Sequence, residues 1–191
     1  MRTDGDDRIR NGVVVSLAPE AAAAEPCRAR ISPRLMAVLT EELGELPGAE
    51  PWRGVVLRRA TVFQGALRIG DVDAILTASI QLVGLGEGST PAGDDYLVGV
   101  LLALSQGDND GCRDSLLASL AGIGDGRTTS ASAAWLSAAA RGEASPVWRA
   151  LLDAWTAGEE HAVRICVRAV RGTGHTSGAF SLRGFLDTLS D

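Results

Sequence analysis

Lysine is absent from this chain of 191 residues, and all 18 of its positively charged side chains are arginines. The absence excludes a Walker-type nucleotide site with its P-loop lysine, a Schiff base with pyridoxal phosphate, and a lysine general base. A cationic side chain that contacts a substrate must therefore be an arginine, whose planar fork suits carboxylates and phosphates.

Aromatic residues and long apolar runs are also scarce. Aromatics make up 4% of the chain against 46% hydrophobic residues, which predicts an aliphatic core with close helix contacts. No run approaches the roughly 20 apolar residues that cross a bilayer, and the start MRTDGDD lacks the apolar stretch of a signal peptide. The cysteines Cys27, Cys112 and Cys166 are odd in number and have no CxxC spacing. We therefore expect a cytoplasmic protein with reduced thiols and no membrane partner.

The charge balance excludes nucleic acid as a partner. Acidic residues number 24, the net charge is −6, and the arginines form no basic stripe along the sequence. Nucleic-acid binding depends on such a stripe, because neutralised phosphates supply most of its affinity. A small anionic metabolite is the more plausible ligand.

Apolar spacing divides the chain near residue 78. The first half contains β-like runs at 12–17, 54–59, 61–63 and 66–69, and one helix opened by Pro33. In the second half the spacing becomes three and four, which predicts helices at roughly 91–106, 111–122, 129–141, 146–156, 158–171 and 177–189. The prediction is an α+β fold, with a small antiparallel β subdomain over 1–78 packed on a helical subdomain of about six helices over 79–191.

The segment GLGEGSTPAGDDYLVG over 84–99 carries the strongest functional signal. Its glycines can bring backbone N–H groups close to a ligand, and Thr90-Pro91 then starts a helix whose unpaired N–H groups face the same loop. The simpler alternative is a tight turn before a well-capped helix. The hypothesis is an anion site formed by Gly86, Gly88, Ser89, Thr90 and Gly93.

Two adjacent acids, Asp94 and Asp95, follow in the first turns of that helix. Together with Glu87 they would repel an anion unless a cation lay between, and Mg²⁺ held by Asp94 and Asp95 would serve. An arginine could fill that role instead. Arg127 is the first candidate, beside Thr128 and Thr129, although these threonines are also typical helix caps.

A similar pattern recurs 85 residues later, since 93–101 and 178–186 both read G-x-x-x-L-x-G-x-L. A glycine inside a helix costs about 1 kcal/mol relative to alanine and usually has a packing reason. We therefore expect the two helices to cross closely at Gly99 and Gly184, which would bring TGHTSG over 173–178 opposite the first loop. In that arrangement His175 becomes a candidate for proton transfer, and the anion site gains Thr176, Ser177 and Gly178. The alternative for His175 is a polar loop residue.

Three motifs in order resemble the AllH-like bacterial family over about residues 80–189. They are GLGEGSTPAGDDYLVGVLLAL, then Thr128-Thr129 with Ser132 and Ala139, Ala140, Gly142 and Glu143, then GHTSG over 174–178. The resemblance implies a subunit of an oxamate carbamoyltransferase of allantoin catabolism, which handles a carbamoyl or carboxylate group and works with an FdrA-type partner.

The functional hypothesis combines these signals. A small phosphorylated or carboxylated metabolite binds between the two glycine-rich helix starts, with Asp94, Asp95 and His175 as the catalytic candidates. The chain acts as a carbamoyltransferase-type enzyme subunit in a multi-subunit complex, and a homo-oligomer is a further expectation. The alternative is a non-catalytic interaction subunit, in which the glycines serve helix packing and partner docking.

Overall fold

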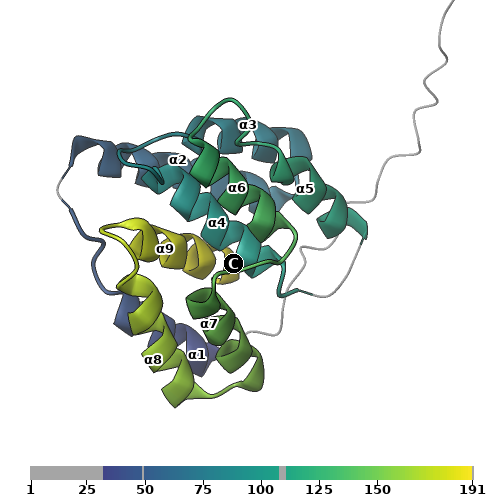
Figure 1. Cartoon of the computed structure of the whole chain (residues 1–191). Helices are drawn as coiled ribbons and strands as arrows, with labels where there is room; N and C mark the ends of the chain where they lie inside the picture. Colours follow the sequence, from purple (N-terminus) through teal and green to yellow (C-terminus); the bar gives the residue numbers. More distant parts are fainter. Residues whose placement is uncertain (1–31, 49, 108–110, 191) are drawn as a thin grey trace, which may run out of the picture.

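The computed structural model describes residues 32–48, 50–107 and 111–190, and in these ranges every regular element is a helix (Figure 1). The strand expected at 12–17 lies outside the described residues. The helices are α1 (Pro33–Leu43), α2 (Pro51–Ile69), α3 (Val72–Leu82), α4 (Ala92–Leu104), α5 (Gly111–Ala121), α6 (Ser130–Ala140), α7 (Pro146–Ala157), α8 (Glu160–Arg171) and α9 (Ser177–Leu189).

The expectation of an α+β fold is wrong, because the β-like runs at 54–59, 61–63 and 66–69 form one helix, α2. Pro51 occupies the start of this helix, where its missing N–H costs nothing. Val56, Ala60 and Phe63 follow at helical spacing and are buried on one face. This helical face outweighs the preference of the β-branched residues for strands. Residue 78 lies inside α3, and the division into 1–78 and 79–191 stays a prediction.

The six helices predicted for the second half are confirmed, and so is the helix at Pro33. Two starts show the expected capping. Ser145 accepts a hydrogen bond from the N–H of Trp148, and Thr129 accepts one from the N–H of Ser132. The expectation that Thr90 caps α4 is wrong, because the helix begins at Ala92 with Pro91 at the N-cap position and no side-chain capping hydrogen bond.

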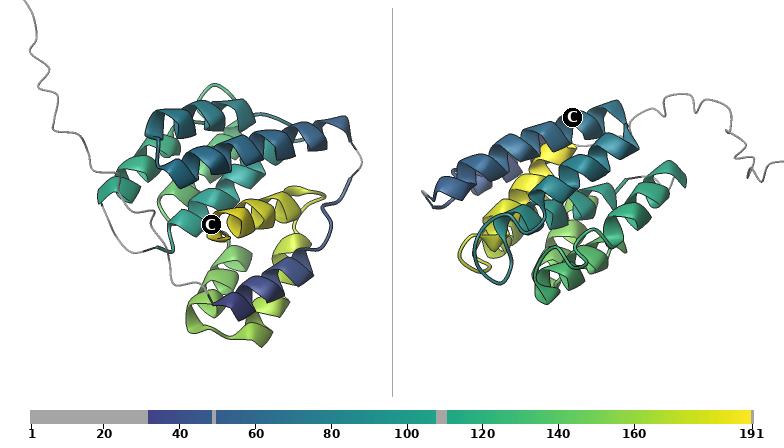
Figure 2. Two further views of the ribbon diagram at one scale, coloured as in Figure 1. Left: turned by 180° about the vertical axis from the view of Figure 1, so that it is seen from behind. Right: turned by 90° about the horizontal axis from the view of Figure 1, so that it is seen from above.

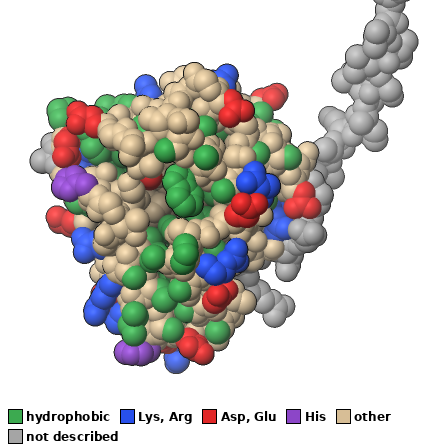
Figure 3. All heavy atoms as spheres, in the orientation of Figure 1, with side chains coloured by type: hydrophobic (Ala, Val, Ile, Leu, Met, Phe, Trp, Pro, Cys, Tyr) green, Lys and Arg blue, Asp and Glu red, His purple; other side chains and the backbone are tan. Residues whose placement is uncertain are grey.

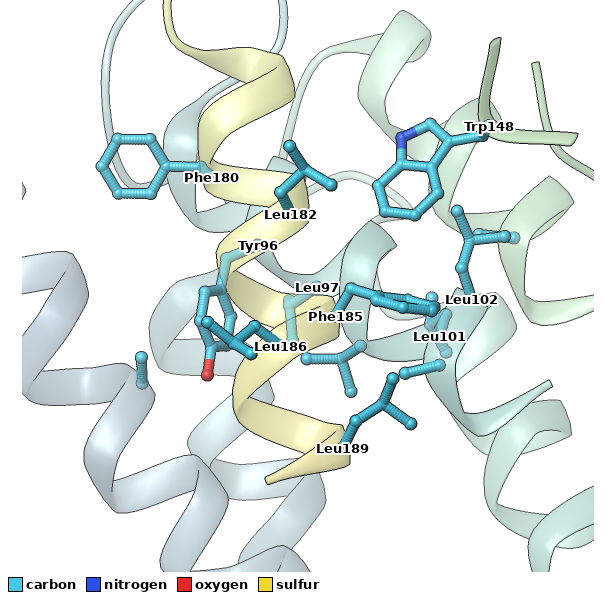
Figure 4. Packing of buried hydrophobic residues seen from close by; sticks show 14 of the residues in the cluster. Tyr96, Leu97, Leu101, Leu102, Trp148, Phe180, Leu182, Phe185, Leu186 and Leu189 are labelled. Carbon is cyan, nitrogen blue, oxygen red and sulfur yellow. The ribbon is translucent and has the colours of Figure 1, made fainter. Parts of the chain in front are cut away.

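Helices α4 and α9 cross at the centre of the molecule. A Cβ atom placed on Gly99 would lie 1.8 Å from the carbonyl oxygen of Ser181, and one on Gly184 would lie 2.0 Å from that of Tyr96. The predicted glycine crossing is therefore confirmed. Buried side chains of both helices interlock around it (Figure 4). The ring of Phe185 on α9 also meets that of Trp148 on α7, with centroids 5.3 Å apart.

The other helices gather on the two sides of this central pair. In Figure 1, α5 and α6 lie beside α4, whereas α1, α7 and α8 lie on the side of α9, and Figure 2 gives the arrangement of α2 and α3 from two further directions.

Arg168 and Arg164 of α8 both bind Glu42 of α1, whose side chain is 9% exposed. These guanidinium groups, Arg168 first, lower the pKa of Glu42 and fix α1 to α8. None of the described helices has both the length and the apolar character needed to cross a membrane.

Candidate functional site

Asp94 fastens two loops to the start of α4. Its Oδ1 accepts a hydrogen bond from the N–H of Gly84 at 2.8 Å, and its Oδ2 accepts one from the hydroxyl of Thr128. The hydroxyl of Thr129 donates to the carbonyl oxygen of Ser89 at 2.6 Å. Gly84 has a φ of +72° and approaches the carbonyl of Arg127 so closely that a Cβ would lie 2.7 Å from it. The segments 84–89 and 127–129 are thus brought together, as the sequence suggested, and Asp94 has a partner on each oxygen.

Asp95 faces different surroundings, because neighbouring residues of a helix point about 100° apart. Asp95 is 8% exposed, and its Oδ2 has no hydrogen-bond partner within the described part of the chain. Burial is the main cause that raises the pKa of Asp95 to about 7, and the charge of Asp94 acts in the same direction, whereas the hydroxyls of Ser177 and Thr90 lower it. The hydroxyls of Thr90 and Ser177 lie 2.8 Å apart and join the start of α9 to the loop before α4.

A cavity of about 290 Å³ lies where α4, α6, α7 and α9 meet, and Asp95 is part of its wall. Helices α4, α6 and α9 each contribute one face at helical spacing, and α7 contributes Trp148. The lining residues are Thr90, Asp95, Val98, Leu102, Ser132, Trp135, Ala139, Glu143, Ala144, Ser145, Trp148, Thr173, Gly174, Ser177, Gly178 and Ser181. Figure 3 shows this face of the molecule, with a hollow beside a large hydrophobic side chain near its centre.

The cavity wall combines apolar surface with a few polar groups. Trp135, which is 47% exposed, and Trp148 supply indole surface. Ser132 is 1% exposed, and its Oγ, like Asp95 Oδ2, has no hydrogen-bond partner among the described residues. Apolar walls with a few convergent polar groups are typical of small-molecule sites.

Four helix N-termini meet at this cavity. Asp95, Ser132, Trp148 and Ser177 belong to the first turns of α4, α6, α7 and α9 in that order. Each N-terminus carries a partial positive charge equivalent to roughly half a proton. Asp95 and Glu143 are the acidic residues of the wall, and none of its described residues is an arginine. The arrangement can therefore hold a small polar molecule, with helix dipoles in place of a cationic side chain.

The glycines predicted to form the anion site also have packing roles. A Cβ on Gly86, at a φ of +121°, would lie 2.7 Å from the backbone nitrogen of Ala92. One on Gly93 would lie 2.0 Å from the carbonyl oxygen of Leu82, and one on Gly178 would lie 1.8 Å from that of Val170. Gly88 also has a positive φ, but no atom lies within 4 Å of its Cβ position. Three of these glycines therefore allow close approach of backbone, and Gly178 lines the cavity as well.

Of the predicted site residues, Thr90, Asp95, Ser177 and Gly178 line the cavity, and the others lie outside its wall. His175 and Arg127 are exposed, and the side chain of Thr176 makes no capping hydrogen bond at the start of α9. Asp94 and Asp95 point into different surroundings, and no group of three His, Cys, Asp or Glu residues suited to a metal occurs among the described residues. Mg²⁺ binding and proton transfer by His175 stay predictions.

Sequence reasoning missed the two tryptophans of the wall and Ser181. On α6 the signal was present, because Ser132, Trp135 and Ala139 repeat at three and four and share one helix face. Trp148 was not recognised, because the sequence around it indicated only the start of a helix. These residues become recognisable as a set only when the crossing of four helices is known.

The described residues form an all-helical fold, and their cavity has the apolar wall and few polar groups that are typical of small-molecule sites. A family model described as oxamate carbamoyltransferase subunit AllH matches residues 82–189, which is more than half of the chain and includes the whole cavity wall. The chain belongs to this AllH family and is therefore related to a carbamoyltransferase subunit of multi-protein complexes. Neither the curated proteins nor the solved structures contained a match.

Proposed function

We propose that this chain is a subunit of a carbamoyltransferase that acts on oxamate or a closely similar small acid, and that the cavity between α4, α6, α7 and α9 holds this substrate. One observation carries the proposal. The three segments behind the family resemblance, at 84–95, 128–143 and 174–178, are far apart in sequence, and each supplies residues to this one cavity wall.

The size and polarity of the cavity suit such a substrate. Its volume of about 290 Å³ is at the lower end for ligand sites, which favours a metabolite of a few heavy atoms over a nucleotide. Oxamate carries a carboxylate and a primary amide. The carboxylate is favoured near the first turns of α7 and α9, whose helix dipoles point their positive ends at the cavity. Trp135 and Trp148 give the wall apolar surface against which the planar substrate would pack.

The proposed reaction transfers a carbamoyl group from carbamoyl phosphate to the amide nitrogen. The new N–C bond forms as the C–O bond to phosphate breaks, the amide nitrogen loses one proton, and phosphate leaves. Because the family is described as a subunit, we propose that a second protein of FdrA type completes the enzyme.

The experiment compares two alanine-to-tryptophan variants in a complex reconstituted with the partner. Ala144 is half-buried and lines the cavity, so Ala144→Trp would fill it, whereas Ala134 is exposed on α6 outside the wall and Ala134→Trp is the matched control. Phosphate release that depends on oxamate, and the N-carbamoyl product by mass spectrometry, are measured. We expect Ala144→Trp to lower the rate about 20-fold or more and Ala134→Trp to change it less than about twofold.

The outcomes separate the enzyme subunit from its alternative. If no complex releases phosphate in response to oxamate, the proposal is wrong. If the complex is active and Ala144→Trp assembles with unchanged activity, the chain is a non-catalytic interaction subunit and the cavity is not its substrate site.

A further inference from the structure

We infer that the part of the cavity next to Asp95 and Ser132 is a site for hydrogen-bond donors. There Asp95 Oδ2 and Ser132 Oγ accept hydrogen bonds from N–H groups of the substrate, so that the site selects a primary amide or ureido group over a carboxylate. The inference rests on the proposed function, since it assigns one end of the substrate to one end of the same cavity. Nothing in the family description makes this assignment.

Two orphaned polar atoms carry the inference. Asp95 Oδ2 and Ser132 Oγ are both buried, have no hydrogen-bond partner among the described residues, and belong to residues that line the same cavity. A buried acceptor without a donor costs about 1–3 kcal/mol, so native structures keep few of them. Asp95 Oδ2 and Ser132 Oγ lie on adjacent helices, α4 and α6, and both belong to the wall of one cavity, where a bound ligand would supply the missing donors.

The chemistry of the two atoms specifies that partner. A carboxylate oxygen such as Asp95 Oδ2 accepts hydrogen bonds and repels another carboxylate, whereas the other acid of the wall, Glu143, is paired with Arg141. The Ser132 hydroxyl can accept one bond and donate another. A primary amide nitrogen has two N–H donors, one for each orphaned atom, and the indole surface of Trp135 and Trp148 suits a planar amide. A carboxylate of the same shape offers no donor.

The assignment also gives the amide proton a destination. When the nitrogen forms its bond to the carbamoyl carbon, the N–H that points to Asp95 transfers its proton to the carboxylate oxygen, and phosphate departs with the electron pair of the broken C–O bond. Asp95 would then contact the reacting nitrogen directly.

A pair of isosteric probes tests the selectivity in the full chain. Acetamide and acetate differ in having NH₂ or O⁻ at one position, and urea serves as a second N–H donor. Binding is followed at pH 8 by NMR through the indole N–H signals of Trp135 and Trp148, assigned with Trp135→Phe and Trp148→Phe. We expect acetamide and urea to bind about tenfold or more tightly than acetate.

Variants of the wall residues then show which side chains cause the preference for acetamide over acetate. Asp95→Asn should reduce the ratio of acetamide to acetate affinity about tenfold, and Ser132→Ala should weaken acetamide binding about fivefold. Asp153→Asn, an exposed acid on α7 outside the wall, is the control and should leave the ratio unchanged.

Acetate affinity equal to that of acetamide in the unaltered chain, or an unchanged ratio in Asp95→Asn, would overturn the inference. If the complex transfers the carbamoyl group but the chain does not prefer acetamide to acetate, the inference is wrong and the proposed function stands. If the chain prefers acetamide but the complex transfers no carbamoyl group, the proposed function is wrong and the selectivity for N–H donors stands.

Discussion

Replacing Asp95 by asparagine should make the protein more stable at pH 8. Burial raises the pKa of Asp95 from an ordinary value of 3.8 to about 7, so the folded state holds a proton that the unfolded state releases. A group with a raised pKa contributes stability that is complete below about pH 4 and is lost as the pH rises through 7. At about 1.4 kcal/mol for each pKa unit, the difference reaches about 4 kcal/mol above pH 7. The neutral amide of the Asp95→Asn variant would carry no charge and would avoid this cost.

Urea unfolding followed by circular dichroism between pH 4.5 and 8.5 measures the effect. The stability of the unaltered chain should fall across this range relative to Asp95→Asn, and the variant should be more stable by about 2–4 kcal/mol at pH 8. The Asp153→Asn control should follow the unaltered chain. A variant less stable than the unaltered chain at pH 8 would refute the reasoning, since it would show that the carboxylate is well stabilised in the folded protein.

Two further predictions concern the frame around the cavity. Gly99→Ala should destabilise the fold by about 3 kcal/mol or more in urea unfolding, because its Cβ would meet the backbone of Ser181, whereas Gly65→Ala, whose Cβ meets nothing within 4 Å, should stabilise α2 by about 0.5–1 kcal/mol. A similar response of both variants would contradict the close crossing. Asp94→Ala should cost about 2–4 kcal/mol, because the partners of both carboxylate oxygens lose their acceptor, and Asp94→Asn should cost less. Equal losses would show that the two hydrogen bonds contribute little.

Helices with clear starts and a single apolar face were predictable from the sequence. Thr90-Pro91 and Ser145-Pro146 indicated the starts of α4 and α7, and the glycines at 99 and 184 indicated the crossing of α4 with α9, because a glycine inside a helix usually marks close packing. Helix α2 was missed because Val55, Val56 and Val62 favour strands locally. The tertiary burial of its helical face decides the structure.

For the candidate site, the sequence predicted only that three loop segments lie close together. The sequence placed the segments at 84–93, 127–129 and 173–178 near one another, and the hydrogen bonds of Asp94 and Thr90 show that they meet. It treated Asp94 and Asp95 as a pair, whereas the helix turns one toward the loops and the other into the cavity. Trp135 and Trp148 could not be assigned to the wall, because that depends on how α6 and α7 pack against α4 and α9.

The most direct test of the account locates oxamate on the full chain. Titration with oxamate, followed by backbone amide shifts in NMR, should move signals in the first turns of α4, α6, α7 and α9, and Ala144→Trp should abolish these changes while Ala134→Trp keeps them. Shifts confined to the outer faces of α2 and α3 or of α1 and α8, or identical titrations in both variants, would contradict the claim that this cavity is the substrate site.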